Sequence, residues 1–96
     1  MTTLQELREI IDVIDKQIVE LYEQRMELCE QVADIKLSIG KEIFDQQREL
    51  EKLQSVEACC KDEKNRKGIR ALFQHIMTLS KEVQCKYMEN KEKSIS

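Results

Sequence analysis

Proline and tryptophan are absent from this sequence, glycine occurs twice and histidine once. Because proline and glycine are the residues that most readily interrupt helices, their scarcity favours long helices over a fold of short strands and tight turns. The 96 residues are rich in Glu, Lys, Gln and Leu, which favour helix throughout the chain. We therefore predict an all-α fold in which residues 1–96 form a single small domain.

Long apolar runs are also missing. No stretch approaches the length of a membrane-spanning helix, and the first residues, MTTLQELRE, lack the basic segment and apolar core of a signal peptide. We expect a cytoplasmic protein that makes no use of a membrane. The net charge is -3, and the basic residues are interleaved with acidic ones instead of forming a stripe, so we also expect no nucleic-acid partner.

The four cysteines do not form a metal-binding pattern. Cys29, Cys59, Cys60 and Cys85 show no paired CxxC spacing, and a single histidine accompanies them. We predict no metal site. In a chain without an export signal, these side chains are expected to be reduced, partly buried thiols.

The sequence does contain a long apolar seam. From residue 4 to residue 39, apolar side chains recur alternately three and four positions apart, and only Arg25 interrupts them. Thr3 and Glu6 have the spacing of a capping box, and Gly40 is a typical helix stop, so we predict one helix over residues 4–39. The positions of this seam are Leu4, Leu7, Ile11, Ile14, Ile18, Leu21, Arg25, Leu28, Val32, Ile35 and Ile39.

A helix of this length does not fit inside a compact domain of 96 residues. It would be about 54 Å long, whereas a globule of this size has a radius of gyration of only about 12–13 Å. Part of the helix must then project from its own subunit while carrying the same apolar seam. We therefore predict that a second copy of the chain covers it, giving an intertwined homodimer of three-helix subunits.

Two further helices complete the predicted subunit. Asp45 can cap a helix over about 45–60, and the polar segment 60–68 is expected to hold the next turn. A third helix is predicted over about 66–89 because apolar residues recur there at helical spacing. Residues 90–96 are expected to fray.

Polar residues occur at positions of these helices that should face the interior. Arg25 and Lys36 are eleven residues apart, so they lie within about 20° of each other on one helix face. Ser80 and Gln84 lie one turn apart on the inner face of the third helix. Each residue alone is explained by register selection, a surface charge or a packing hydrogen bond. Taken together, these positions would place the cations Arg25 and Lys36 inside an apolar bundle without a compensating charge. An anionic ligand would supply that charge and stabilise the two cations.

The residues indicate chemistry without a nucleophile. The sequence has no Ser/His/Asp or Cys/His arrangement and no glycine-rich phosphate loop, and we expect His75 to be structural. Arginine and lysine suit a small molecule with several carboxylates, since guanidinium groups bind carboxylates through paired hydrogen bonds. Catalysis at such a site would rest on positioning and electrostatics and would need no cofactor.

Several ordered motifs resemble those of the AroQ-type chorismate mutases, the all-helical class of the shikimate pathway. They are LxxLR at residues 4–8, IDxxIVxLxxxR ending at Arg25, VADIK at 32–36, DQQRE at 45–49 and an LFQ...S...Q pattern over 72–84. The resemblance covers nearly the whole chain. It implies a domain-swapped dimer of three-helix subunits with two active sites, each completed by an arginine from the partner.

The resemblance also implies a reaction and a set of residues for it. The reaction is the Claisen rearrangement of chorismate to prephenate, a step in phenylalanine and tyrosine biosynthesis that passes through no covalent intermediate. Lys36 and Gln84 would donate to the ether oxygen, and Glu49 would receive the ring hydroxyl. The catalytic residues implied are Arg25, Lys36 and Gln84. The substrate contacts implied are the partner subunit's Arg8, together with Arg25, Lys36, Asp45, Arg48, Glu49, Ser80 and Gln84.

Two alternatives remain at the level of sequence. An isochorismate-pyruvate lyase uses the same scaffold and similar cations, although the joint presence of Asp45, Glu49 and Ser80 favours the mutase. A noncatalytic helical dimerisation module would use the charges in its seam only to fix register. The sequence leaves open whether the domain acts alone or within a bifunctional enzyme, how it is regulated, and what role Cys59 and Cys60 have.

Overall fold

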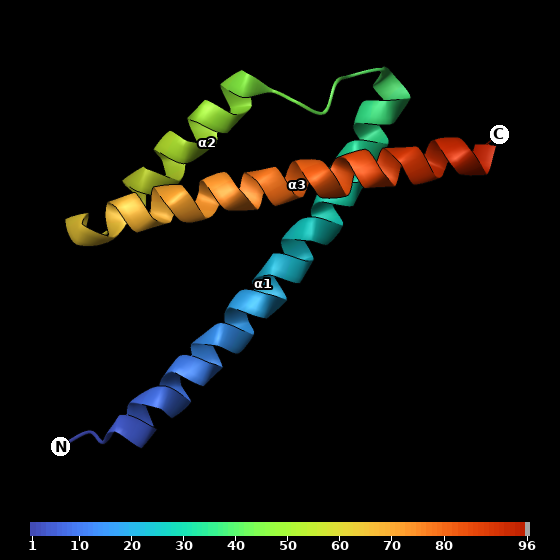
Figure 1. Cartoon of the computed structure of the whole chain (residues 1–96). Helices are drawn as coiled ribbons and strands as arrows, with labels where there is room; N and C mark the ends of the chain where they lie inside the picture. Colours follow the sequence, from blue (N-terminus) through green and yellow to red (C-terminus); the bar gives the residue numbers. More distant parts are fainter. Residues whose placement is uncertain (96) are drawn as a thin grey trace.

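The chain folds into three α-helices and a short 3-10 turn (Figure 1). A computed structural model describes residues 1–95, and no strand occurs among them. The all-α prediction is therefore confirmed. The helices are α1 (Leu4–Ile39), α2 (Gln46–Ala58) and α3 (Arg66–Ile95), with the 3-10 turn η1 at Glu63–Asn65. None of the described helices has the length and apolarity needed to cross a membrane.

Both ends of α1 are set by the residues that predicted them. The Thr3 side chain accepts a hydrogen bond from the backbone N–H of Glu6 at 3.1 Å, which caps the first turn. At the other end Gly40 adopts a left-handed conformation with φ of 71°, and the N–H of Lys41 donates to the carbonyl of Lys36 at 2.8 Å. This is the Schellman arrangement that ends many helices. The predicted bounds of 4–39 are confirmed.

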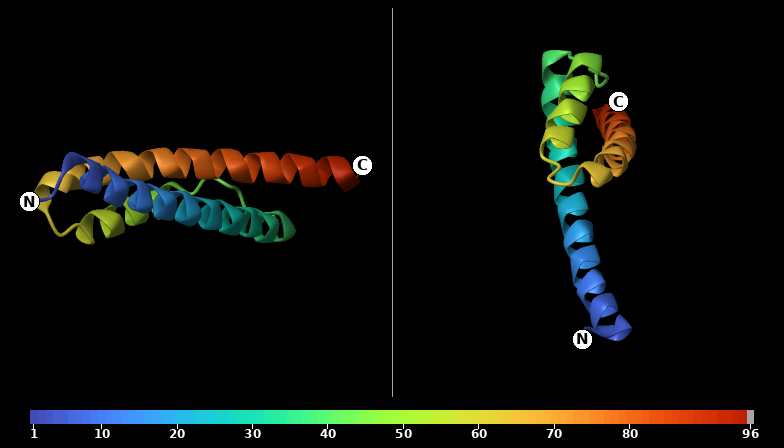
Figure 2. Two further views of the ribbon diagram at one scale, coloured as in Figure 1. Left: turned by 90° about the horizontal axis from the view of Figure 1, so that it is seen from below. Right: turned by 90° about the vertical axis from the view of Figure 1, so that its left-hand side faces the viewer.

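The N-terminal half of α1 projects from the rest of the subunit. In Figure 1 and in the right-hand view of Figure 2, α3 crosses the C-terminal half of α1, while the N-terminal half extends away. Every residue from 1 to 24 is exposed. The radius of gyration is 17.3 Å and the longest extent is 63 Å, well above the value of about 12–13 Å expected for a compact globule of this length.

Helix α1 has two distinct apolar faces. The face that packs within the subunit carries Met26, Cys29 and Ala33, and Ala33 is completely buried. The predicted seam lies beside it, and all of its apolar members remain 43% to 66% exposed. Since residues one position apart differ by about 100° around a helix, Arg25 and Lys36 fall between the two faces, where both side chains are half-buried. The seam is therefore apolar surface that the subunit itself does not bury.

The remaining helices follow the prediction except at the C-terminal end. Asp45 caps α2 by accepting from the N–H of Arg48 at 3.0 Å, and α3 begins at Arg66 as expected. The predicted end of α3 near residue 89 is wrong, because the helix continues to Ile95. The expected fraying is also wrong for residues 90–95, because these residues are helical. The segment contains no proline or glycine that would stop the helix. Ser96 lies outside the described residues.

The two glycines offer a test of this backbone geometry. No atom lies within 4 Å of a Cβ added at Gly40 or Gly68, so any effect of alanine must come from the backbone. Gly40→Ala should destabilise the protein by about 1–2 kcal/mol, since its left-handed conformation is strained for alanine. Gly68→Ala, inside α3, should stabilise it by up to about 1 kcal/mol. Urea unfolding at one protein concentration would measure both, and shifts of the same sign would contradict the assigned helix end.

Candidate active site

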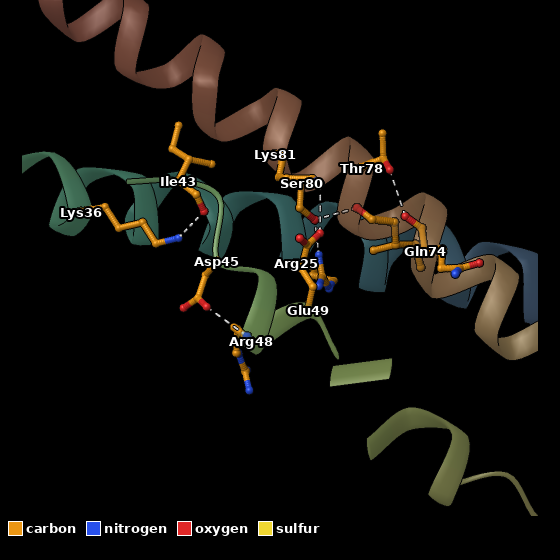
Figure 3. Close-up of polar contacts among 11 residues, drawn as sticks. Arg25, Lys36, Ile43, Asp45, Arg48, Glu49, Gln74, Thr78, Ser80 and Lys81 are labelled. Atoms are coloured by element: carbon orange, nitrogen blue, oxygen red, sulfur yellow. Dashed lines mark hydrogen bonds and ion pairs between the residues drawn. The ribbon is translucent and has the colours of Figure 1, made fainter. Parts of the chain in front are cut away.

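A cavity of about 200 Å³ lies where the C-terminal half of α1, the start of α2 and the middle of α3 meet. Figure 3 shows polar side chains of all three helices pointing toward this region. Its lining residues are Arg25, Cys29, Val32, Lys36, Ile43, Asp45, Arg48, Glu49, Lys52, Met77, Ser80, Lys81 and Gln84.

Seven of the eight predicted site residues line this cavity. They are Arg25, Lys36, Asp45, Arg48, Glu49, Ser80 and Gln84. Arg8 does not line it, because Arg8 is exposed on the projecting half of α1. We predicted that Arg8 reaches the active site of the partner subunit. The structure of a single chain does not test this prediction.

Arg25 is held against α3 by a serine. Its Nη1 donates a hydrogen bond to Oγ of Ser80, and Ser80 Oγ donates in turn to the carbonyl of Ile76 at 2.8 Å (Figure 3). Cys29 Sγ lies 3.7 Å from the same Nη1. A guanidinium group has five N–H donors. These contacts therefore fix the head group of Arg25 while other donors can serve an anion in the cavity.

Lys36 is oriented by the segment that joins α1 to α2. Its ammonium group donates to the backbone carbonyl of Ile43 at 2.8 Å. An ammonium group has three N–H donors, so this one bond leaves donors for a ligand. Sequence reasoning missed Ile43, because a backbone carbonyl in a connection gives no side-chain signal.

Gln84 brings an amide into the interior. Its side chain is 8% exposed, and its Oε1 has no hydrogen-bond partner in the described part of the chain. A buried polar atom without a partner costs about 1–3 kcal/mol. Oε1 is an acceptor and would need a donor, whereas the Nε2 end of the same amide carries the two N–H donors that an oxygen of a ligand can use.

The two carboxylates of the site have different surroundings. Asp45 caps α2, so one of its oxygens is engaged with the backbone N–H of Arg48. Glu49 forms an ion pair with Lys81, with Oε1 and Nζ 3.0 Å apart. Lys81 was not among the predicted residues. It follows Ser80 directly in the sequence, but its pairing with α2 depends on how the helices pack.

Positive charge dominates the lining. Five cationic side chains face only two carboxylates there, although the whole chain has a net charge of -3. A concave site with excess positive charge attracts anions. The cationic members of the lining are Arg25, Lys36, Arg48, Lys52 and Lys81.

Neither a metal centre nor a histidine contributes to this cavity. Among residues 1–95 no group of three or more His, Cys, Asp or Glu side chains is arranged to hold a metal ion. His75 is exposed and does not line the cavity. The cations of this cavity, together with the Gln84 amide, can donate hydrogen bonds to an anion and stabilise its charge.

Comparison with known proteins assigns the chain to a family. The family model described as chorismate mutase type II matches residues 7–85. A chorismate mutase from Methanocaldococcus jannaschii is 34% identical over 87 residues, which cover 90% of this chain and 88% of that protein. No solved structure gives a significant match. The chain belongs to the chorismate mutase type II family, and its enzyme class is that of the isomerases.

The chain contains an internal probe of ligand binding in the cavity. Cys29 lines the cavity, whereas Cys59 is exposed at the end of α2 and does not. Prephenate, a dicarboxylate, should slow the alkylation of Cys29 by iodoacetamide several-fold and leave that of Cys59 unchanged, because a bound ligand would cover only the first thiol. Peptide mass spectrometry would measure both rates in one sample, with sodium chloride matching the ionic strength. Equal protection of both thiols would argue against binding in this cavity.

Proposed function

We propose that this cavity binds chorismate and catalyses its rearrangement to prephenate. The observation that carries the proposal is the convergence of Arg25, Lys36 and Gln84, from two helices, on one cavity with excess positive charge. Chorismate mutase activity is the activity of the family to which the chain belongs. A dianionic substrate matches a site of this charge.

In the proposed complex, the cations hold the carboxylates of the substrate. Arg25, steadied by Ser80, would bind one carboxylate, and Arg8 of the partner subunit would bind the other. Arg48 also lines the cavity. Two anchored carboxylates would restrict a flexible molecule to the compact conformer that reacts, which is catalysis by positioning.

The bond changes need no protein nucleophile and no proton transfer. The ether C–O bond breaks as a new C–C bond forms within the same molecule, so no atom or electron is exchanged with the protein. Negative charge develops on the ether oxygen in the transition state. Lys36, which would also contact a carboxylate, and Gln84 would donate hydrogen bonds to that oxygen, and Glu49, with Asp45 nearby, would accept one from the ring hydroxyl. Donors aimed at developing charge favour the transition state over the substrate.

We also propose that the active protein is an intertwined homodimer. The exposed seam of α1 is a long apolar surface, and surfaces of this size on a small protein are typical of interfaces. An antiparallel pairing of two α1 helices, centred near residues 18–20, would cover the seam. The same pairing would bring Arg8 of the partner subunit toward the region of Arg25 and Lys36.

Other expectations from the sequence remain predictions. They are a cytoplasmic location and the absence of a nucleic-acid partner. The lyase alternative concerns the same cavity and is distinguished by its substrate and product. The dimerisation module is distinguished by how its stability responds to the replacement of Arg25, the cation in the seam.

Replacing that cation tests the proposed function. Arg25→Leu should lower kcat/KM for chorismate by at least about 10²–10³-fold, because a carboxylate anchor is lost, while the helical circular dichroism and the dimer persist. Arg66→Leu is the matched control, since Arg66 pairs with Glu63 on the exposed surface. Its activity should change by less than about twofold. A gain in stability in Arg25→Leu, with no turnover of chorismate by either the wild type or the variant, would favour the noncatalytic dimerisation module.

A subunit-mixing experiment tests the shared site. Arg8→Ala and Arg25→Leu should each be nearly inactive alone. Unfolding and refolding them together should recover about a quarter of the wild-type activity, because half of the dimers are then mixed and each mixed dimer has one intact site.

The control for the mixing experiment combines two substitutions of residues that one subunit contributes to its own site. Arg25→Leu mixed with Lys36→Met leaves every site damaged, so no recovery is expected. If Arg8→Ala and Arg25→Leu also failed to recover activity after refolding into dimers, the contribution of Arg8 across the interface would be contradicted.

A further inference from the structure

We propose that Lys81 is a positioning residue, which holds the Glu49 carboxylate in the geometry that the reaction needs. The inference rests on the proposed function, because Glu49 is the proposed acceptor for the ring hydroxyl of the substrate. Lys81 itself is assigned no contact with the reacting atoms.

The contacts of Lys81 join three parts of the subunit. From α3 its ammonium group lies 3.0 Å from Glu49 Oε1, on α2, and 4.9 Å from the centre of the Phe44 ring, in the connection (Figure 3 shows Lys81 beside Glu49). An ammonium group over an aromatic ring is attracted by the negative face of the ring. One cation therefore contacts both the start of α2 and the segment that precedes it.

The connection is held from two sides. Lys36 of α1 donates to the carbonyl of Ile43, and Lys81 of α3 lies over the next residue, Phe44. Both lysines line the cavity. The connection thus contacts one cation of α1 and one of α3, and its Phe44 ring helps to fix where the ammonium group of Lys81 lies.

Stability alone does not account for this ion pair. The side chains of Lys81 and Glu49 are 36% and 24% exposed, and ion pairs with this access to water contribute little to folding. Both side chains line the cavity, so the ion pair can affect the geometry of the site more than the stability of the fold. Without Lys81, Glu49 would have Lys52 as a neighbouring cation, three residues further along the same helix and also in the lining. The carboxylate would then turn along α2 and away from the place assigned to the ring hydroxyl.

The test is a double-mutant cycle on the full-length chain. Lys81→Met should lower kcat/KM for chorismate about tenfold, and Lys81→Arg should restore most of it, because arginine can pair with Glu49. In a Glu49→Gln background, Lys81→Met should have no further effect, since the group that Lys81 positions is already gone. Lys86→Met removes an exposed lysine from the same helix outside the cavity and should leave activity unchanged.

Each other outcome is decisive. An equal loss on Lys81→Met in the wild-type and Glu49→Gln backgrounds would overturn the positioning role, because Lys81 would then act independently of Glu49. No loss in the wild-type background, or no rescue by arginine, would overturn it as well. If Lys81→Met failed to fold, Lys81→Gln would replace it in the cycle. Turnover of chorismate by the wild-type chain tests the proposed function separately, so a failed cycle with an active wild type rejects only the role of Lys81.

Discussion

Arg25 and Lys36 carry positive charge into the interior of a very small helical bundle, and the need to hold them there organises the rest of the structure. Both side chains fall between two apolar faces of α1, one packed on α3 and one exposed. Burial of an unpaired cation costs several kcal/mol, so each head group needs partners. The serine of α3 supplies one for Arg25, and a backbone carbonyl of the connection supplies one for Lys36. The remaining donors face a cavity suited to an anion.

This division of α1 into two faces also explains how so short a chain builds an active site. A subunit of 96 residues has little interior, and the described residues include only four buried apolar side chains. Of these four, only Met77 also lines the cavity, whose other walls are mainly polar side chains. The exposed seam is apolar surface that a second subunit would cover, and in the proposed dimer the interface and the active site are continuous.

The sequence predicted α1 well because each of its signals is local. Thr3, Glu6 and Gly40 set the ends of the helix through contacts within a few residues. The seam was also a sound guide to an apolar face, but it did not reveal that Met26 and Ala33 form the face packed within the subunit. That choice depends on how closely α3 approaches, and Ala33 permits a close approach because its side chain is small. The end of α3 was placed too early because the last residues of the sequence were expected to fray, as termini often do, whereas the helix continues to Ile95.

In the site too, the sequence predicted residues whose pattern is local and missed residues whose contacts depend on tertiary packing. Ser80 and Gln84 were predicted because they share one face of one helix with a spacing of one turn. Lys81 and the carbonyl of Ile43 were missed because their contacts join segments that are distant or irregular in sequence. For Arg8 the motif predicted a role that only a second subunit can complete.

The most direct test of the central claim is product identification by NMR after the purified chain is incubated with chorismate and, separately, with isochorismate. NMR is needed because prephenate has the same mass as chorismate. Prephenate from the first sample is the expected result. Pyruvate from isochorismate without any prephenate from chorismate would contradict the mutase and assign the cavity to the lyase reaction, and no conversion in either sample would contradict an enzymatic role for the cavity.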